Sequence, residues 1–325
     1  MNMLRKLALA GAFAMSLVAA PAGAQQTLTF GGSDAVGSLF DRANAKFAEL
    51  VNQRGGDRLR INYIQGEQLG NDIDVIQQMM QGSVQMYGDV LDWYGNWVPD
   101  FNVLNWGFTF RDNDHLQKFL ESDLYAAAAE RLRKEQGLRV LSAAPTQPRI
   151  LLAKRAVNTP DDLNGIKMRV PEIRTYLLLW QALGTKPSRL AWAEIFLGLS
   201  TGTVEATEGP VSATYAAKLH QAAKFVMRTD HLLSTHHITI NDAAYQALEP
   251  DLQEMLVQAA KEVSVWVRAQ GEAETEQVIQ NMAKEGATVV KVDREPFVQK
   301  ALEGVAEMEK SGVWPAGLWE KIRGL

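Results

Sequence analysis

The sequence predicts an α/β fold built from two parts, and three features of the chain predict it. Short apolar strands alternate with amphipathic helices over residues 27–90, and a similar alternation returns over residues 169–226. One amphipathic helix then covers residues 251–285, which is long enough to span both parts of a chain of 325 residues. Strands joined through helices form parallel or mixed sheets, which bind ligands at the carboxyl ends of their strands.

The first alternation has the order β-α-β-α-β. Gly55 and Gly56 end its first helix, and Gly82 ends the second. Asn71 or Asp72 is expected to cap the second helix, because an Asn or Asp side chain accepts hydrogen bonds from the free N–H groups of a first turn. The predicted elements are strand 27–32, helix 40–53, strand 59–64, a helix from about residue 72 to Gly82, and strand 84–90.

The second alternation is less regular, and the long helix follows it. Gly184 ends one short helix and the turn at Gly202 ends another. The long helix contains no proline after its start, and Gly271 is expected to weaken or bend it. The predicted strands are 138–143, 150–154 and 166–170, and the predicted short helices are 176–183 and 192–199.

Residues 1–24 are predicted to be a secretory signal peptide. Arg5 and Lys6 form a positive region, an apolar run follows over residues 7–20, and small residues then predict cleavage after Ala24. The apolar run is too short for a confident membrane span, and no cysteine follows it that could carry a lipid. The mature protein is therefore expected to be soluble and exported to the periplasm.

The mature chain is acidic and has no cysteine. Cleavage removes two of the 33 basic residues and none of the 38 acidic residues, so the net charge changes from −5 to −7. This charge argues against nucleic acid and anionic membranes as partners, and any selectivity for anions must come from a few placed basic side chains. The absence of cysteine excludes disulfides, thiol catalysis and thiolate metal sites.

Arg169 stands in an apolar strand and is the first candidate for ligand binding. Side chains alternate along a strand, so the apolar residues of 166–170 are expected to face the core while Lys167 and Arg169 share the other face. A guanidinium in such a place needs an anion, and a carboxylate fits its fork of N–H donors best. The alternative is a structural arginine paired with a neighbouring Asp or Glu. The strand therefore predicts a site for an organic acid.

Several short motifs resemble, in order and spacing, those of one family. They include the segment 161–171, which contains Arg-Val-Pro, and the segment 192–205. The other motifs lie at 47–51, 68–72, 78–86, 99–101, 108–112, 137–141 and 182–187. With these motifs the chain resembles the periplasmic solute-binding subunits of tripartite ATP-independent periplasmic (TRAP) transporters, of the DctP type.

The resemblance implies a periplasmic-binding-protein-like fold with two α/β lobes, hinge strands between them and a long helix across both. The ligand cleft then lies between the lobes and closes on a carboxylate-bearing solute. Residues 25–147 plus about 235–270 are expected to form lobe I, and residues 148–234 plus about 271–325 lobe II. The expected partners are the membrane permease subunits of a TRAP transporter, and the protein is expected to be a monomer.

The resemblance also implies roles for single residues. Arg169 matches the arginine that pairs with the ligand carboxylate, and Arg149 matches a second arginine that assists it. Gln68 lies in a loop of lobe I that faces the cleft, and Trp192 matches a residue that lines it. Many members end a later motif in Gln-Glu-Asn-Pro, whose amide helps to hold the carboxylate. This chain has Gly209 there, so a backbone N–H, a water or another residue must serve.

Three acidic residues are candidates to bind the rest of the ligand. Asp89 and Asp92 follow the strand 84–90, where each could accept hydrogen bonds from hydroxyls, face an ammonium group, or, at Asp92, cap a helix. Glu172 is either an acceptor in the cleft or a charge at a helix N-terminus. Arg149 could also belong to a surface turn. The acidic residues favour a hydroxylated or sugar acid, with a dicarboxylate or keto acid close behind.

The sequence contains no enzyme signature, and no cofactor or metal is expected. It lacks the Gly-x-Ser-x-Gly motif, a phosphate-binding loop and the dinucleotide glycine motif. Asp161 and Asp162 are expected to form a solvated turn. His236 and His237 are adjacent on a strand and point to opposite faces, so they are not expected to share one ion.

The predicted function is capture of an organic acid and its delivery to a TRAP-type transporter. A second interpretation is a sensor that delivers the same solute to a receptor kinase, and the sequence does not separate the two. Neighbouring genes for two permease subunits would favour transport. A secreted hydrolase or lyase is a third interpretation, which turnover of a ligand would support.

Overall fold

Three parallel strands and two helices open the chain, as the sequence predicts. The computed structural model describes residues 25–325, so the predicted signal peptide lies outside the described residues. β1 (Gln26–Gly31) pairs in parallel with β2 (Leu59–Ile64) and β3 (Met86–Asp89), and α1 (Leu39–Gly55) and α2 (Asp72–Gln81) connect them. Asn71 and Asp74 form a capping box at the start of α2, and Gly82 ends it in the left-handed conformation.

Two strands run between the two lobes. β4 (Leu138–Ala153) is a single strand of 16 residues, whereas the sequence predicts two strands here. Its first part pairs with β9 (Leu233–Asn241), and its second part pairs with β7 (Ala206–Pro210) and β8 (Phe225–Met227). Register shifts beside Pro145 and Pro148 accommodate the two prolines, so the strand continues through the segment that looks like a turn.

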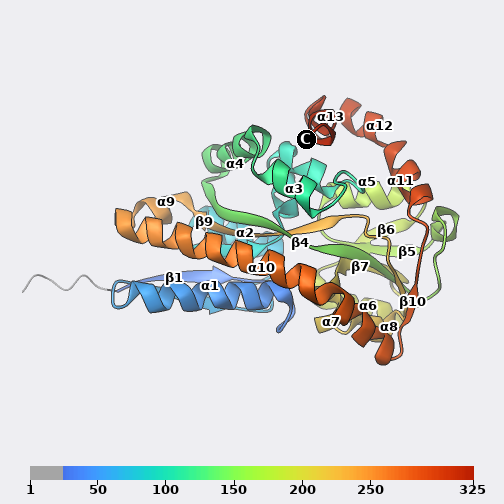
Figure 1. The fold of residues 1–325 in the computed structure, drawn as a ribbon, viewed down its shortest axis with the longest axis horizontal. Helices are drawn as coiled ribbons and strands as arrows, with labels where there is room; N and C mark the ends of the chain where they lie inside the picture. The colour runs from blue at the N-terminus through green and yellow to red at the C-terminus, as the bar shows by residue number, and fades with distance from the viewer. Residues whose placement is uncertain (1–24) are drawn as a thin grey trace, which may run out of the picture.

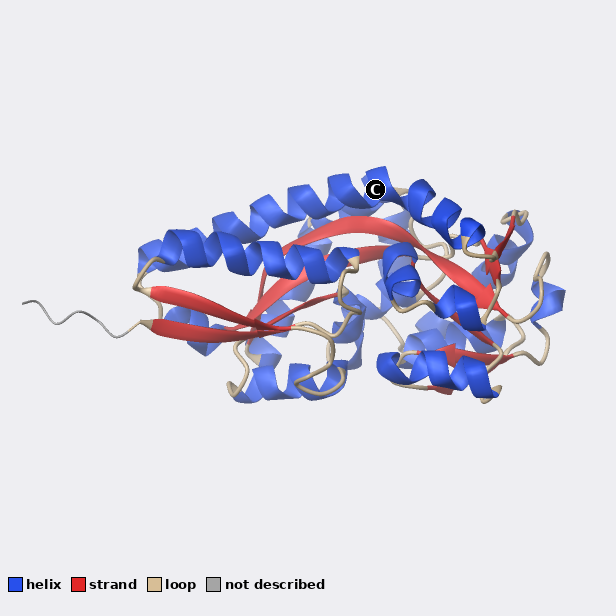
Figure 2. Ribbon diagram, turned by 90° about the horizontal axis from the view of Figure 1, so that it is seen from below, coloured by secondary structure: helices blue, strands red, loops and turns tan. Residues whose placement is uncertain are grey.

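The sheet of the second lobe continues from β4. Its order is β4-β7-β5-β6, with β5 (Lys167–Val170) between β7 and β6 (Lys186–Arg189), while β10 (Thr288–Val290) pairs with β8. Figure 2 shows the strands passing from one lobe into the other with helices on both sides. The predicted alternation in β5 is confirmed, because Lys167 is exposed while Met168 and Val170 are buried in the core.

The long helix α10 (Pro250–Lys284) crosses both lobes (Figure 1), as predicted. Arg54 pairs with Glu262 on the first lobe, and farther along the helix Gly271 lies directly against β4. A Cβ atom at Gly271 would lie 3.0 Å from the carbonyl oxygen of Thr146, which is tighter than most Cβ contacts, so a side chain here would push the helix and the strand apart. The glycine therefore permits close packing of the helix on the strand that joins the lobes.

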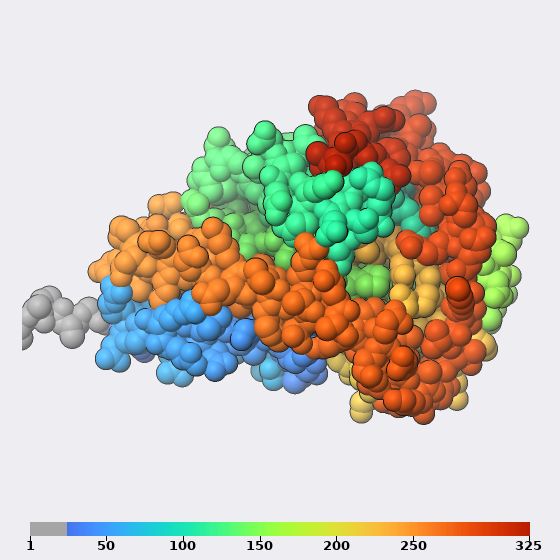
Figure 3. Space-filling view, in the orientation of Figure 1, coloured from blue at the N-terminus to red at the C-terminus, as the bar shows by residue number. Residues whose placement is uncertain are grey.

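The remaining helices cover the sheets and close the C-terminal end. Trp106 Nε1 donates to the carbonyl of Ala301 at 3.0 Å, and His115 Nε2 contacts the carbonyl of Ile322 at 2.7 Å. The C-terminal segment thus packs on residues near 100–120, as the space-filling view shows (Figure 3). This contact joins a segment expected in lobe II to one expected in lobe I, so the residue bounds of the two lobes stay a prediction. These helices are η1 (Leu91–Asn96), η2 (Pro99–Asn105), α3 (Asn113–Leu120), α4 (Asp123–Gln136), η3 (Pro160–Leu163), α5 (Arg174–Ala182), η4 (Trp192–Glu194), α6 (Ile195–Thr201), α7 (Val211–Ala216), α8 (Leu219–Ala222), α9 (Asp242–Gln246), α11 (Glu295–Leu302), α12 (Val305–Lys310) and α13 (Leu318–Arg323).

Two apolar clusters form the core. The larger follows the sheet through both lobes, and a smaller one lies in the second lobe around Ile150, Leu199 and Val226. Asp162 accepts hydrogen bonds from the backbone of Asn158 and Thr159 in the turn before β5, as the solvated-turn prediction requires. Within residues 25–325, no helix has the length and apolar character needed to span a membrane.

Candidate functional site: a cavity between the lobes

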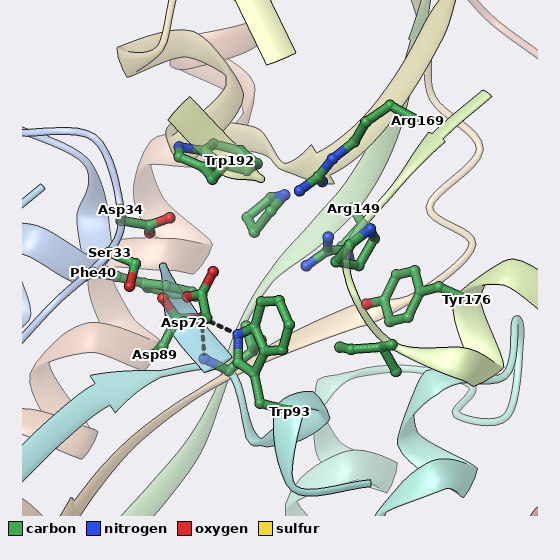
Figure 4. Close-up of a pocket in the computed structure, with 14 residues that line it drawn as sticks. Ser33, Asp34, Phe40, Asp72, Asp89, Trp93, Arg149, Arg169, Tyr176 and Trp192 are labelled. Atoms are coloured by element: carbon green, nitrogen blue, oxygen red, sulfur yellow. Dashed lines mark hydrogen bonds between the residues drawn. The ribbon is translucent and has the colours of Figure 1, made fainter. Parts of the chain in front are cut away.

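A partly open cavity lies between the two lobes. It is bounded by the carboxyl ends of β1, β3 and β5, which is where an open α/β sheet binds its ligands. Figure 4 shows two arginines on one side and three aspartates on the other. The lining residues are Ser33, Asp34, Phe40, Asp72, Asp89, Val90 and Trp93 from the first lobe, and Arg149, Arg169, Pro171, Ile173, Tyr176, Trp192 and Pro210 from the second.

Arg169 enters the cavity from β5 without a counter-ion. Its side chain is only 2% exposed, and its Nε donates to the carbonyl of Leu190 at 2.9 Å. In the part of the chain that the structure describes, its two terminal nitrogens have no hydrogen bond and no carboxylate within 4.0 Å. Burial lowers the pKa of Arg169 to about 10. The guanidinium therefore still carries a proton at neutral pH but lacks the anion that would balance it.

Arg149 is paired, in contrast. Its Nε and Nη2 donate to the two carboxylate oxygens of Glu208 at 2.6 and 2.8 Å, and both side chains are almost fully buried. The pair forms because Arg149 lies opposite Pro210 in the antiparallel ladder, which places Glu208 diagonally on the same face. Burial alone would raise the pKa of Glu208, but Arg149 and a contact from His231 Nε2 lower it to about 2.

Asp92 acts on the cavity through Tyr176. Asp92 is 3% exposed, and its carboxylate accepts a hydrogen bond from the Tyr176 hydroxyl at 2.6 Å. The ring of Tyr176 lies 5.2 Å from the guanidinium carbon of Arg149 and lines the cavity. Burial raises the pKa of Asp92 to about 6, against the opposing effect of Arg149. Asp92 itself is not a lining residue, and it sits in the first turn of η1 and not at its N-cap.

Three carboxyl groups form the opposite side of the cavity, and we call Asp34, Asp72 and Asp89 the acidic wall. Asp89 and Asp72 are each 6% exposed, and Asp34 is partly exposed. Burial and the neighbouring Asp72 raise the pKa of Asp34 to about 7, and burial raises the pKa of Asp72 and Asp89 as well. The salt bridges of residues 25–325 include none to any of the three, so no basic side chain of the described residues pairs with the acidic wall.

Trp192 covers Gly209 and lies beside Arg169. The Trp192 ring centroid is 5.7 Å from the guanidinium carbon of Arg169. A Cβ atom at Gly209 would lie 2.8 Å from Thr214 Cγ2 and 3.3 Å from the Trp192 ring. Gly209 is buried in β7 and does not line the cavity, so its lack of a side chain leaves room for the indole.

The structure does not bring Gln68 or Glu172 to the main cavity. Gln68 is exposed in the loop after β2, and Glu172 is exposed beside a smaller pocket that Arg169 and Asp72 also line. The residue next to Gln68 makes the contact between the lobes instead, because Glu67 accepts a hydrogen bond from the backbone N–H of Ala193 at 3.2 Å. Of the predicted site residues, Arg169, Arg149, Asp89 and Trp192 therefore line the cavity.

Sequence reasoning missed Asp34 and Asp72 as cavity residues. Asp34 follows Ser33 directly after β1, and this position at the end of a parallel strand is a signal that could have identified it. Asp72 looks like a helix cap, but Asn71 performs that role and leaves the Asp72 side chain for the cavity.

The histidines do not form a metal site in the described residues. His236 Nε2 contacts Asn44 Oδ1 at 3.0 Å, whereas His237 Nδ1 contacts Thr239 at 2.9 Å. Burial lowers the pKa of both rings. Residues 25–325 contain no group of three or more His, Cys, Asp and Glu side chains that could hold a metal ion.

Comparison with known proteins identifies one family. The profile of DctP, bacterial extracellular solute-binding protein, family 7, matches residues 31–311. The chain is 29% identical over 280 residues to the 2,3-diketo-L-gulonate-binding periplasmic protein YiaO of Escherichia coli, which covers 84% of each chain. It is 27% identical to a solute-binding protein of Roseobacter denitrificans, covering 83% of this chain and 85% of the other.

A solved structure shares the fold. A TRAP periplasmic solute-binding protein from Pseudomonas putida F1, solved with bound D-glucuronate, superimposes with a TM-score of 0.85 at 24% identity. The match covers 92% of this chain and 97% of that chain. The similarity therefore supports the two-lobed architecture over almost the whole described chain.

Proposed function

The chain belongs to bacterial extracellular solute-binding protein family 7, and we propose that it captures an organic acid in the cavity between its lobes and delivers it to a TRAP-type membrane transporter. Export through a signal peptide cleaved after Ala24 is part of this proposal. The protein acts as a binding protein in it, with no chemical step. The transporter subunits are its proposed partners.

The observation that carries the proposal is the state of Arg169. A buried guanidinium without an anion is costly, and a ligand carboxylate would supply two acceptors in the geometry of its terminal N–H groups. Arg149 is held by Glu208 through Nε and Nη2, so its Nη1 is the nitrogen left to assist. Trp192 beside Arg169 excludes water from the ion pair, which strengthens the pair.

The acidic wall restricts the rest of the ligand. Carboxylates accept hydrogen bonds, so the groups that face Asp72 and Asp89 must be donors. A second carboxylate would be repelled there, and this argues for a single-carboxylate acid over a dicarboxylate. The ligands named for two similar proteins agree with this class, because 2,3-diketo-L-gulonate and D-glucuronate each carry one carboxylate and several hydroxyls, whereas a third similar protein is named for C4-dicarboxylates.

The contacts between the lobes support binding by closure. Glu67 accepts from the backbone of Ala193, and Asn96 donates to the carbonyl of Glu172 at 3.1 Å, so both sides of the cleft touch at its rim. Gln68 lies next to one of these contacts, and we propose a role for it in closure, not in direct ligand binding. A closed rim keeps the ligand from water and offers one continuous surface to a permease.

The test is calorimetric titration of the purified protein with D-glucuronate, L-galactonate, 2,3-diketo-L-gulonate and succinate. We expect at least one monocarboxylate to bind, and Arg169→Ala to weaken it by about 3–5 kcal/mol, or roughly two to four decades in affinity. Lys167→Ala is the matched control, since Lys167 lies two residues away on the same strand but is exposed. Unchanged affinity in Arg169→Ala would contradict the proposal.

A further inference from the structure

We propose that the ligand carries a positively charged nitrogen at the end opposite its carboxylate, and that Asp72 and Asp89 form the subsite for it. The inference rests on the proposed function, because it takes the carboxylate to lie on Arg169. It goes further in naming a zwitterionic substrate class, which differs from the sugar acids named for the relatives.

The charge inventory of the cavity is the first argument. Arg149 and Glu208 neutralise each other, which leaves Arg169 as the one positive charge among the lining residues that is not already paired. Asp34, Asp72 and Asp89 face it across the cavity (Figure 4). A monoanionic ligand pairs with Arg169 but leaves the acidic wall without a cation. A zwitterion has no net charge, and it places its carboxylate at Arg169 and its positively charged nitrogen at the acidic wall.

The unused acceptors of the acidic wall are the second argument. Asp89 receives the backbone N–H of Val90 at 2.6 Å and Trp93 Nε1 at 3.3 Å, both on Oδ1, so its Oδ2 has no hydrogen bond within the described residues. Asp72 receives the Tyr87 hydroxyl on Oδ1, and the hydroxyl of Ser33 also lies beside its carboxylate, so Asp89 is the less satisfied of the two. An ammonium group has several donors and can donate to both carboxylates, whereas a hydroxyl has one.

Asp72 and Asp89 lie deep in the wall of the cavity. Each is only 6% exposed, and both line the cavity, so a group that enters the cavity can reach their carboxylate oxygens. Burial raises the pKa of both groups, and a cation bound beside them would oppose that effect. Arg169, at 2% exposure, stands across the same cavity with its own terminal nitrogens lacking a partner in the described chain. The two sites together match a molecule with opposite charges at its ends.

The test uses acids that differ in one terminal group. The first set is 4-aminobutanoate, 4-hydroxybutanoate and succinate, and the second is 6-aminohexanoate, 6-hydroxyhexanoate and adipate. Thermal-shift and calorimetric measurements at pH 7.5 should show the amino acid of at least one set binding at least tenfold tighter than its hydroxy partner, with the dicarboxylate weakest. Asp89→Asn should abolish that preference, so that the ratio of the two affinities falls from at least tenfold to about one.

Two results would overturn the inference: a hydroxy acid or dicarboxylate that binds as tightly as its amino partner, or no shift with either amino acid. Asp72→Asn is a second variant, so that a folding defect in one variant does not decide the outcome. If monocarboxylates bind through Arg169 but the amino group gives no advantage, the proposed function stands and this inference fails. If butylamine binds wild type and Arg169→Ala equally while acids do not bind, the acidic subsite stands and the proposed function fails.

Discussion

β4 and β5 each bring an arginine to the same cavity, and the surroundings of the two arginines are opposite. Arg149 on β4 makes two hydrogen bonds with the carboxylate of Glu208, and Tyr176 packs on its guanidinium. Arg169 on β5 has one hydrogen bond, to a backbone carbonyl, and no carboxylate within reach in residues 25–325. Both side chains are buried, so burial alone does not distinguish them.

The difference suggests separate roles: Arg149 stabilises the folded protein, and Arg169 is available to bind a ligand. In a buried ion pair each charge is balanced by the other, and removal of one member leaves the remaining charge uncompensated. Arg149 and Glu208 therefore depend on each other in the ligand-free protein. Arg169 costs stability until a ligand arrives, which is typical of residues retained for function.

Arg149→Ala is expected to have the largest effect on stability. It leaves the carboxylate of Glu208 buried, with His231 as its remaining ion-pair partner in the described residues, and the expected loss is about 3–5 kcal/mol in the free energy of unfolding. Urea unfolding of the ligand-free protein measures it. The double variant Arg149→Met/Glu208→Gln removes both charges and should recover most of the loss. A loss below about 1 kcal/mol in Arg149→Ala would show that the pair contributes little.

Stability should change with pH in opposite directions for the paired carboxylate of Glu208 and for Asp34, which has no salt bridge. Glu208 has its pKa lowered from 4.5 to about 2, so it contributes stability that is present above pH 4.5 and is lost as the pH falls through about 2. Asp34 has its pKa raised from 3.8 to about 7, so the ligand-free protein should lose stability as the pH rises from 3.8 to about 7.

Melting temperatures between pH 2 and pH 8 check both signs. In Arg149→Met/Glu208→Gln the melting temperature should fall less at acid pH than in the wild type. In Asp34→Asn it should fall less as the pH rises towards neutral. Asp161→Asn serves as the control, because Asp161 is exposed in the turn before β5. A melting temperature of Asp34→Asn that follows the wild-type curve would show that ionisation of Asp34 does not destabilise the ligand-free protein.

The sequence predicted the elements whose signals are local. The order β1-α1-β2-α2-β3 and the helix α10 follow from periodicity, caps and glycine stops, all of which lie within a few residues of the element they mark. The prediction of two strands in place of β4 was wrong, because Pro145 and Pro148 are typical of a turn. Pairing with β9 and packing on α10 keep that segment in an extended strand, and these contacts come from residues about a hundred positions away.

The same distinction applies to the site. Arg169 could be predicted because an arginine in an apolar strand is conspicuous, and the motif around it resembles a family pattern. The pairing of Arg149 with Glu208 depends on the register between β4 and β7, which no local pattern specifies. The acidic wall depends on β1, α2 and β3 meeting at one edge, so Asp34 and Asp72 could be recognised only once the strands were in place.

The smallest expected effect, and the one of opposite sign, belongs to Arg169. Arg169→Met removes a buried charge that lacks a partner in the described chain, at the cost of one hydrogen bond to Leu190. The expected result is a gain of about 1 kcal/mol in the free energy of unfolding of the ligand-free protein, since replacing buried charge by a well-packed apolar side chain is often neutral or stabilising. Urea unfolding in a buffer free of carboxylates measures it, with Lys167→Met, exposed on the same strand, as the control. A loss comparable to that of Arg149→Ala would make Arg169 a structural residue like its neighbour, and the contrast between the two strands would no longer point to a ligand.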